Sequence, residues 1–360
     1  MHITIVTAAI ASGGAQRVIV QLLNKWIKDG DKCSLILLNK EEDFYKIDQR
    51  VSIYRIGKVS DNNVIDKLKR YKQVRDIVKK LKPDVVLSMP EEIGIYVIGA
   101  LLGIKVPVVV SERNNPWVMP YKKVTRILRK ILYPFASGLI FQTKGASSFF
   151  SKRIQEKGII LPNPLDISRL PEPYHGERRK IIVGVGRLEK QKNFSLLIEA
   201  FADFYKKNND YELHIFGDGS LKQELSELSD KLLPKGKVKL LGNNRELLNS
   251  IKDCAIFALS SDYEGVPNVL IEAMAIGMPV ISTDCDPGGA RELIENGVNG
   301  IIVPKKDISG MHSAMEYLIQ NPDVAAELAN NAIRIKERLN ADIVCREWKD
   351  YLICVSGKNK

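Results

Sequence analysis

Short runs of apolar residues, each followed by a longer segment with helical periodicity, recur along the whole chain of 360 residues. Runs that are apolar almost throughout are typical of strands buried on both faces, and the helical segments between them cover those faces. We therefore expect parallel sheets with helices on both sides. In the first half, the predicted strands are Ile3–Val6, Lys32–Leu38, Asp84–Ser88, Val106–Ser111 and Gly138–Gln142.

The same alternation restarts after a polar, proline-containing stretch at Pro171–Arg179. A chain of this length is enough for two domains of ordinary size. We predict an α/β protein of two doubly wound, Rossmann-like domains, residues 1–171 and 172–342, that face a central cleft. Residues 343–360 are predicted as a C-terminal helix that can return to the first domain. The predicted strands of the second half are Lys180–Gly184, Tyr211–Phe216, Val238–Leu241, Cys254–Ser260 and Pro279–Thr283.

The charge of the chain is one-sided. The formal net charge is +11, and the excess of basic residues falls within the N-terminal half. Such a field indicates an anionic partner: nucleic acid, an anionic membrane or a phosphorylated substrate. The five cysteines are scattered and form no C-x-x-C pair, which favours reduced thiols in a cytoplasmic protein. The longest apolar stretch, Ile93–Val110, is interrupted by glycines, a lysine and a proline, so we expect no membrane span.

Two predicted helices, Val64–Leu81 and Tyr121–Leu132, carry much of this positive charge. Their periodicity predicts one packed face and one cationic face. Lysines that only solubilise an exposed helix are the simple alternative. A peripheral contact with an anionic membrane at its cytoplasmic face is the functional one, and we assign to it Lys69, Arg70, Lys122 and Lys123. No base-stacking aromatics are interleaved with these charges, so nucleic acid is not expected.

Two loops after predicted strands have the residue types of an anion-binding site. Gly13 and Gly14 open a helix after the first strand, where backbone N–H groups attract an anion, although a plain turn explains them equally well. Arg187 and Lys192 lie in the segment GRLEKQKN, residues 186–193, after the first strand of the second half. Two fixed cations would stabilise a diphosphate as it departs. A solvated charged loop is the alternative.

Two glutamates, Glu264 and Glu272, stand eight positions apart around a predicted loop-to-helix junction. Glu272 is placed to accept two hydroxyl hydrogen bonds, as from a ribose, while a chance pair of glutamates stays open as an alternative. Asp284 and Asp286 fit a D-x-D metal pattern, but we expect them to be structural, and we predict neither a metal nor another cofactor. Backbone N–H groups at the junction are expected to face a phosphate, in the segment formed by Val266, Pro267, Asn268 and Val269.

These motifs resemble the retaining glycosyltransferases of family 4, which have the GT-B fold. The N-terminal half is similar more loosely, through SGGAQR and SERNNP. The combination looks most like bacterial enzymes that extend lipid-linked oligosaccharides or surface polysaccharides, often with N-acetylhexosamines. In the second half the matching segments run in the family's order: GRLEKQKN, FGDG at 216–219, LLGN at 240–243, the two glutamates, MAIGMPVIST and GGARELIENGVNGIIV.

The resemblance implies roles for both domains and for single residues. The first domain would bind a glycan acceptor linked to a polyprenyl diphosphate, and the second would bind a UDP-sugar donor without a metal. The implied contacts are Arg187, Lys192 and Gly14 for the phosphates, Glu264 for the transferred sugar, Glu272 for the ribose, and Gly217 and Asn243 for the nucleobase.

One position departs from the family. Many members place a histidine after the fifth strand of the first domain, beside the reacting carbon, whereas this chain has Arg113 there. An arginine, with a pKa above about 12, cannot act as a base near neutral pH, but it can bind a phosphate or a sugar oxygen. This suits a front-face retaining mechanism, in which the leaving phosphate accepts the proton of the acceptor.

Two other functions share this kind of fold. A nucleotide-sugar epimerase should lack the paired glutamates and the Arg187–Lys192 pair, and this chain has both. A catalytically silent subunit that only binds a glycan or nucleotide is disfavoured by the same intact residues, and an assay is needed to exclude it.

Overall fold

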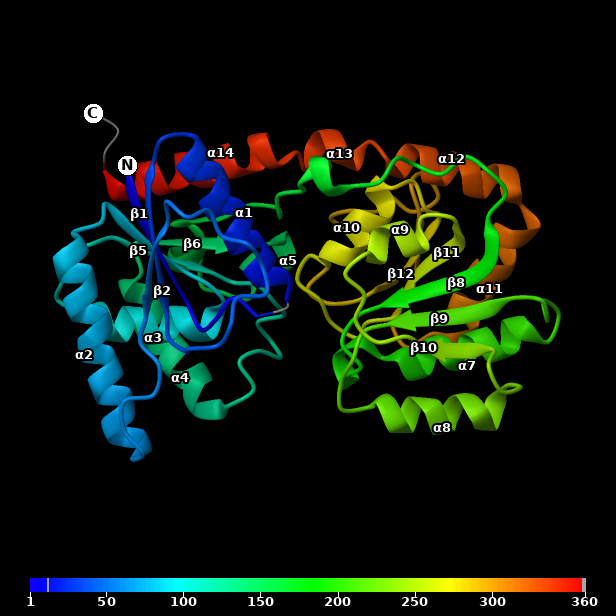
Figure 1. The fold of residues 1–360 in the computed structure, drawn as a ribbon, viewed down its shortest axis with the longest axis horizontal. Helices are drawn as coiled ribbons and strands as arrows, with labels where there is room; N and C mark the ends of the chain where they lie inside the picture. Colours follow the sequence, from blue (N-terminus) through cyan, green and yellow to red (C-terminus); the bar gives the residue numbers. More distant parts are fainter. Residues whose placement is uncertain (12, 358–360) are drawn as a thin grey trace. The chain divides into compact units, whose positions relative to one another are not determined.

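The computed structural model describes residues 1–11 and 13–357 (Figure 1). Ser12, in the predicted glycine turn, and residues 358–360, at the end of the predicted C-terminal segment, lie outside the described residues. The chain divides into two compact units. Unit 1 consists of Met1–Pro164 and Leu339–Lys360, and unit 2 consists of Leu165–Arg338.

Unit 1 is built on a seven-stranded sheet in the order β3-β2-β1-β4-β5-β6-β7. Every neighbouring pair of strands is parallel. Along the strands, alternate side chains enter two different hydrophobic clusters, so the sheet is buried on both faces. The strands are β1 (His2–Thr7), β2 (Lys32–Leu37), β3 (Ser52–Arg55), β4 (Val85–Ser88), β5 (Val108–Ser111), β6 (Gly138–Phe141) and β7 (Gly158–Ile160).

Helices cover both faces of this sheet (Figure 1). Helices α1 and α14 pack against each other on one face, while α3 contacts both α2 and α4 on the other. The bounds are α1 (Gly14–Lys28), α2 (Asn63–Leu81), α3 (Glu91–Leu101), α4 (Lys123–Leu132), the 3-10 turn η1 (Tyr133–Phe135), α5 (Lys144–Ser148), α6 (Lys152–Gln155) and α14 (Ala341–Ser356).

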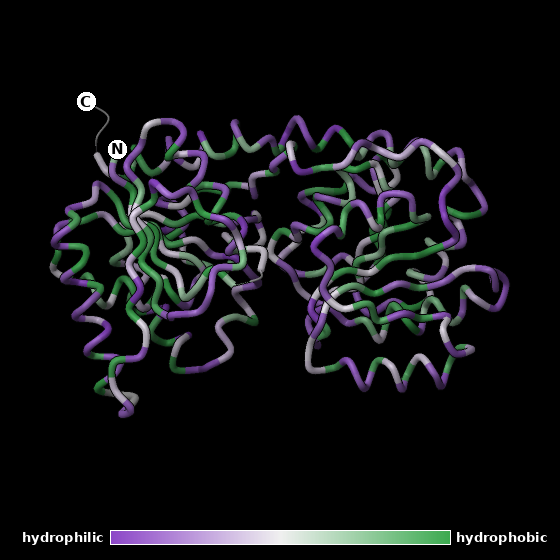
Figure 2. The backbone as a smooth tube through the Cα atoms, viewed as in Figure 1, coloured by the Kyte–Doolittle hydropathy of each residue, from purple (hydrophilic) through white to green (hydrophobic). Residues whose placement is uncertain are grey.

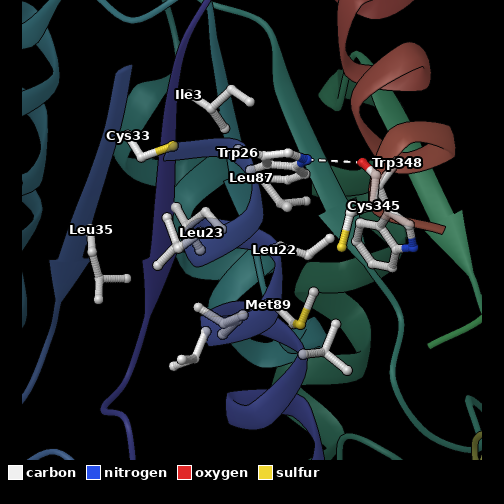
Figure 3. Packing of buried hydrophobic residues seen from close by; sticks show 14 of the residues in the cluster. Ile3, Leu22, Leu23, Trp26, Cys33, Leu35, Leu87, Met89, Cys345 and Trp348 are labelled. Atoms are coloured by element: carbon white, nitrogen blue, oxygen red, sulfur yellow. Dashed lines mark hydrogen bonds between the residues drawn. The ribbon is translucent and has the colours of Figure 1, made fainter. Parts of the chain in front are cut away.

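The C-terminal helix α14 is part of the core of unit 1. Trp26 on α1 and Trp348 on α14 are both fully buried. The indole Nε1 of Trp26 donates to the carbonyl oxygen of Cys345 at 2.9 Å (Figure 3), and the indole of Trp348 donates to the carbonyl of Pro162 at 3.0 Å. The two ends of the chain thus form one hydrophobic cluster.

Unit 2 has a six-stranded parallel sheet in the order β10-β9-β8-β11-β12-β13. The strands of both sheets are predominantly hydrophobic, as expected for sheets with two buried faces (Figure 2). The strands are β8 (Arg179–Val185), β9 (Glu212–Phe216), β10 (Val238–Leu240), β11 (Cys254–Leu259), β12 (Val280–Asp284) and β13 (Ile301–Pro304). The helical elements are η2 (Ile167–Arg169), η3 (Lys190–Lys192), α7 (Phe194–Tyr205), α8 (Lys222–Leu232), α9 (Leu247–Ile251), α10 (Asn268–Ala275), α11 (Ile308–Gln320), α12 (Pro322–Ala332) and α13 (Ile335–Arg338).

The strand order reverses once in each sheet, between β1 and β4 in unit 1 and between β8 and β11 in unit 2. In open parallel sheets, ligands bind at the carboxyl ends of the strands beside such a reversal. The prediction of two doubly wound Rossmann-like sheets is confirmed. Three strands, β3, β7 and β13, lay outside the prediction. Within the described residues, no helix is both long and apolar enough to span a bilayer.

Candidate active site

Three glycine loops meet at the carboxyl edge of the unit 2 sheet. Gly186, Gly217 and Gly242 follow β8, β9 and β10, which are neighbouring strands. The amide of Gly217 donates to the carbonyl of Gly242 at 2.8 Å. A Cβ atom at Gly217 would lie 1.9 Å from the carbonyl oxygen of Gly186, so this position excludes any side chain. The backbone of the FGDG segment therefore packs directly on the loop that carries Arg187 and Lys192.

The position of Lys192 is set by its own loop. Its side chain crosses Gly186, where a Cβ atom would approach the Lys192 Cε to 2.8 Å. The next residue, Asn193, adopts the left-handed conformation with φ of 44° and caps α7 by accepting from the amide of Leu196. The Nδ2 of Asn193 also donates to Asp262 at 2.9 Å, which ties this loop to the segment before Glu264.

Lys192 forms an ion pair with Glu264, with 2.5 Å between Nζ and Oε1. The two side chains are only 13% and 11% exposed, so the pair is largely removed from water. The hydroxyl of Ser261 donates to the same Oε1 at 2.9 Å. Since Lys192 follows β8 and Glu264 follows β11, the ion pair lies at the point where the strand order reverses.

Arg187 is exposed and connects to the same loops through Gln191. Its Nη2 donates to the Gln191 Oε1 at 3.3 Å, and the Gln191 Nε2 donates to the carbonyl of Tyr263 at 3.0 Å. The structure thus brings Arg187, Lys192 and Glu264 together, with one cation open to solvent and one held in a buried pair. The supporting residues Gln191 and Ser261 were not among the predicted site residues, although Gln191 lies inside the GRLEKQKN motif.

The loop with Glu264 is supported from behind by the segment after β12. The amide of Glu264 donates to the carbonyl of Asp286 at 3.0 Å, and a Cβ atom at Gly289 would lie 1.5 Å from the carbonyl oxygen of Gly265. Direct contact between two backbones leaves the loop little freedom to move. It explains why the GGAREL segment has a glycine at position 289.

Helix α10 begins at Asn268, with Pro267 as its N-cap residue. The first amides of a helix have no i−4 carbonyl within the helix to bond to. The predicted segment Val266–Val269 spans the residue before the N-cap, the N-cap itself and the first two residues of this helix. Glu272 lies one turn further along and is 9% exposed. Asn243 is exposed directly after Gly242, and Gly14 is the first residue of α1 in unit 1.

Asp284 and Asp286 both pair with basic side chains. The Arg291 Nε lies 2.9 Å from the Asp284 Oδ1, and Lys305 donates to Asp286 at 2.6 Å. These contacts agree with a structural role for the D-x-D segment. In residues 1–11 and 13–357 there is no group of three or more His, Cys, Asp or Glu side chains suited to a metal ion. Independence from metals stays a prediction.

Arg113 follows β5 in unit 1, and its guanidinium is enclosed by protein. Its Nη2 donates to the Asn163 Oδ1 at 2.5 Å, and the guanidinium lies 5.8 Å from the centre of the Trp348 ring. Its Nε and Nη1 are buried and have no hydrogen-bond partner in the described part of the chain. Burial lowers the pKa of Arg113 to about 10, so the side chain stays charged at neutral pH. A contact of Arg113 with a phosphate or sugar oxygen stays a prediction.

A buried polar cluster beside Arg113 escaped the sequence analysis. Glu112 is 1% exposed and accepts from the hydroxyl of Tyr133, while an Arg129 nitrogen lies 3.9 Å from its other oxygen. Burial, together with the nearby carboxylate of Glu91, raises the pKa of Glu112 to about 8. The available signal was a carboxylate directly after an apolar strand, within SERNNP.

The two basic helices differ from the prediction in which cations face outward. Lys69, Lys122 and Lys123 are exposed as predicted. Arg70 instead donates to the carbonyl of Leu38 at 2.5 Å, and its side chain is 20% exposed. Its guanidinium is used within unit 1, where it also donates to the Asn39 Oδ1 at 3.2 Å and pairs with Asp66 at 3.5 Å.

Both halves of the chain match glycosyltransferase family models. Residues 12–169 match "Glycosyltransferase Family 4", and residues 170–335 match "Glycosyl transferases group 1". An uncharacterized glycosyltransferase of Methanocaldococcus jannaschii is 32% identical over 310 residues, which cover 79% of this chain and 75% of that protein. The chain belongs to glycosyltransferase family 4. This membership favours a transferase over the epimerase considered from the sequence.

Other relatives cover nearly the whole of this glycosyltransferase. A Campylobacter jejuni enzyme named GalNAc-α-(1→4)-GalNAc-α-(1→3)-diNAcBac-PP-undecaprenol α-1,4-N-acetyl-D-galactosaminyltransferase is 28% identical over 355 residues, 97% of each chain. Among solved structures, Anabaena HepE in complex with UDP and glucose has a TM-score of 0.81 at 18% identity, over 97% of this chain and 98% of that one. Sucrose-phosphate synthase from Thermosynechococcus elongatus has a TM-score of 0.87 at 14% identity, over 99% and 100%. These likenesses establish the GT-B fold.

Proposed function

We propose that this glycosyltransferase transfers an N-acetylhexosamine from a UDP-sugar to a glycan acceptor linked to a polyprenyl diphosphate. In this proposal the enzyme is a hexosyltransferase that retains the anomeric configuration and needs no metal. The observation that carries the proposal is the Lys192–Glu264 ion pair at the strand-order reversal of unit 2, beside Arg187. Two Campylobacter jejuni relatives, each 28% identical, are named as N-acetylgalactosaminyltransferases of diphospho-undecaprenol-linked glycans, which supports the acceptor class.

The donor would bind at the carboxyl edge of the unit 2 sheet. Arg187 and Lys192 would neutralise the diphosphate, whose negative charge grows as the glycosidic bond breaks. Glu264 holds Lys192 in place and would accept a hydroxyl of the sugar. The remaining proposed contacts are Glu272 for the ribose, Gly217 and Asn243 for the nucleobase, and the start of α10 and Gly14 for phosphate.

The proposed front-face step needs no side-chain base. The bond between C1 of the sugar and the β-phosphate oxygen breaks, and the acceptor oxygen bonds to C1 from the same face. The proton of the acceptor hydroxyl passes to the departing phosphate oxygen, so that UDP leaves with it. Arg113, which stays protonated, would contribute charge and hydrogen bonds to an oxygen of either substrate.

A panel of donors tests the reaction. The purified protein is incubated with UDP-GalNAc, UDP-GlcNAc, UDP-glucose or GDP-mannose and a short-chain polyprenyl-diphosphate-linked N-acetylhexosamine. Released nucleoside diphosphate and the mass and anomeric configuration of the product are measured. We expect an α-linked product from a UDP-N-acetylhexosamine first and from UDP-glucose next. Use of GDP-mannose alone, or an inverted product, would refute the corresponding part of the proposal.

Metal dependence is measured in the same assay. We expect full activity in EDTA, since two basic side chains are proposed to do the work that a divalent cation does in other transferases. Complete inactivation by EDTA that manganese or magnesium reverses would overturn this part.

The proposed place of action is the cytoplasmic face of the cell membrane, with peripheral attachment. An acceptor on a polyprenyl chain would lie there. The exposed Lys69, Lys122 and Lys123 support attraction to anionic headgroups, at about 1 kcal/mol for each well-placed cation.

A further inference from the structure

The outward side of α4 carries an apolar stripe. Val124, Ile127 and Ile131 are 67%, 59% and 56% exposed. They stand at positions i, i+3 and i+7, so they line up on one side of the helix. Phe135, in η1 directly after α4, is 63% exposed and follows Ile131 by four residues. We call these four side chains the α4 stripe.

This arrangement reverses the usual one, in which a helix on a protein surface buries its aliphatic residues and exposes its cations. Arg129 of the same helix is 3% exposed. Its guanidinium donates to the carbonyls of Met119 and Pro116 at 2.8 Å each and lies 4.7 Å from the centre of the Phe149 ring. Here the prediction of a cationic outer face on this helix is wrong for the arginines, because the loop before α4 offers bare carbonyl groups to them.

Single exposed hydrophobic residues are common on soluble proteins, but a contiguous group of large ones marks an interaction site. In the α4 stripe, four large side chains each expose more than half of their surface. Tyr121, which precedes the helix, is 62% exposed as well. We therefore expect a partner to cover the stripe, and the residues around the stripe indicate the kind of partner.

The residues that border the stripe are lysines. Lys122, Lys123 and Lys130 are exposed, and the helix sequence contains no acidic residue. At about 100° per residue, Lys123 and Lys130 lie together along one edge of the stripe. Aliphatic residues bordered by lysines are typical of helices that lie in the interface of an anionic bilayer. Self-association through α4 would bring together two lysine-bearing helices without an acidic residue on either to pair with them, which disfavours it.

Helix α2, on the same face of the sheet, also exposes apolar residues beside lysines near its N-terminal end. Leu68 and Ile65 on α2 are 62% and 45% exposed, next to the exposed Lys67 and Lys69. Helix α3 contacts both α2 and α4, so the two helices cover the same side of unit 1. Apolar and cationic residues thus occur together at two places on this side.

We propose that α4 is a membrane-docking element, which inserts the α4 stripe into the interface of an anionic bilayer while the bordering lysines bind lipid headgroups. The attachment is then partly hydrophobic and not only electrostatic. This inference rests on the proposed function and deepens it, because a lipid-linked acceptor would lie in the same bilayer.

The test is sedimentation with vesicles of phosphatidylcholine, with or without 30 mol% phosphatidylglycerol, that contain neither donor nor acceptor. We expect the wild type to bind the anionic vesicles, with a fraction that persists in 0.5 M NaCl. The triple variant Val124→Asn, Ile127→Asn and Ile131→Asn should bind at least about 100-fold more weakly, at roughly five- to tenfold for each partly inserted side chain. The triple variant Lys122→Ser, Lys123→Ser and Lys130→Ser should bind about 100-fold more weakly at low salt and should match the wild type in high salt.

A control variant removes exposed aliphatic residues elsewhere on the protein. Ile343 on α14 and Val298 in unit 2 are 46% and 42% exposed, and Ile343→Asn with Val298→Asn should change binding less than twofold. Thermal melts by circular dichroism establish that each variant is folded. Tryptophan fluorescence of Ile127→Trp gives a second measurement, in which insertion shifts the emission to shorter wavelength with anionic vesicles.

Three results would overturn the proposal. The first is a folded aliphatic variant that binds like the wild type. The second is wild-type binding that high salt removes completely, which leaves only the lysines. The third is a wild type that ignores vesicles but forms a dimer by light scattering that Ile127→Asn dissociates, which would make the stripe a protein interface. UDP release with a water-soluble acceptor is measured in parallel. If the wild type released no UDP, the result would count against the proposed function and not against membrane docking.

Discussion

Replacing Lys192 with methionine should damage both the stability of unit 2 and the reaction. The Glu264 carboxylate, 11% exposed, would keep Ser261 as its remaining side-chain donor in the described part of the chain. Removal of one partner from a buried ion pair costs about 3–5 kcal/mol, and the residual exposure and the serine place this case near 3 kcal/mol. For a unit the size of residues 165–338, that lowers the melting temperature by roughly 6–12 °C.

Turnover should fall by about 10²–10³, the usual effect of losing one preorganised charge beside a leaving group. Arg187→Ala is the matched comparison, because Arg187 is exposed and its side chain donates to Gln191 at 3.3 Å. It should lose turnover to a similar extent while its melting temperature stays within about 2 °C of the wild type, as is usual for surface changes. The double variant Lys192→Met with Glu264→Gln should regain most of the stability and none of the activity.

Differential scanning calorimetry and steady-state UDP release measure the two effects. If Lys192→Met melted like the wild type, the pair would not be desolvated as the structure has it. If Lys192→Met and Arg187→Ala both kept near-wild-type turnover, neither residue would stabilise the diphosphate.

Gly289→Ala should destabilise unit 2 by about 3 kcal/mol or more, since its Cβ atom would lie 1.5 Å from the Gly265 carbonyl oxygen. The control variant Gly99→Ala, whose Cβ atom would have its nearest neighbour at 3.5 Å, should melt like the wild type. The melting temperature of unit 1 should fall as pH rises towards about 8, because folded Glu112 keeps a proton that the unfolded chain releases near pH 4.5. Glu112→Gln should flatten this fall, and equal slopes of melting temperature against pH in the two proteins would contradict the reasoning. Glu272→Ala should weaken UDP binding about 10- to 100-fold by calorimetric titration, and an unchanged Kd would exclude the ribose contact.

The sequence was most informative where a segment is buried on two sides. The central strands β1, β4, β8 and β11 are apolar runs whose composition alone predicts them. The three strands that escaped prediction, β3, β7 and β13, lie at sheet edges and have at most four residues, mostly exposed or half-buried. A strand at the edge of a sheet needs to bury only one face and pairs with a neighbouring strand along only one edge. Its sequence therefore lacks the continuous apolar run of a central strand.

At the site, the motifs predicted which residues lie at the sheet edge but not how they pair. Lys192 and Glu264 are 72 positions apart, and their ion pair depends on the adjacency of β8 and β11. The orientation of α4 was not predictable from its periodicity either. Its arginines turn inward because a loop with free carbonyl groups lies beside them, which is a property of the folded unit and not of the helix sequence.

The return of α14 to unit 1 makes unit 2 an insertion within the first unit, entered after Pro164 and left after Arg338. A ribosome that synthesises this chain therefore releases all of unit 2 before unit 1 is complete. Trp26 meets its partner Cys345 only 319 residues later, roughly 15–65 s at the usual 5–20 residues per second. Unit 2 is contiguous and can fold during that interval, so unit 1, whose first strand is made before any part of unit 2, is completed after it.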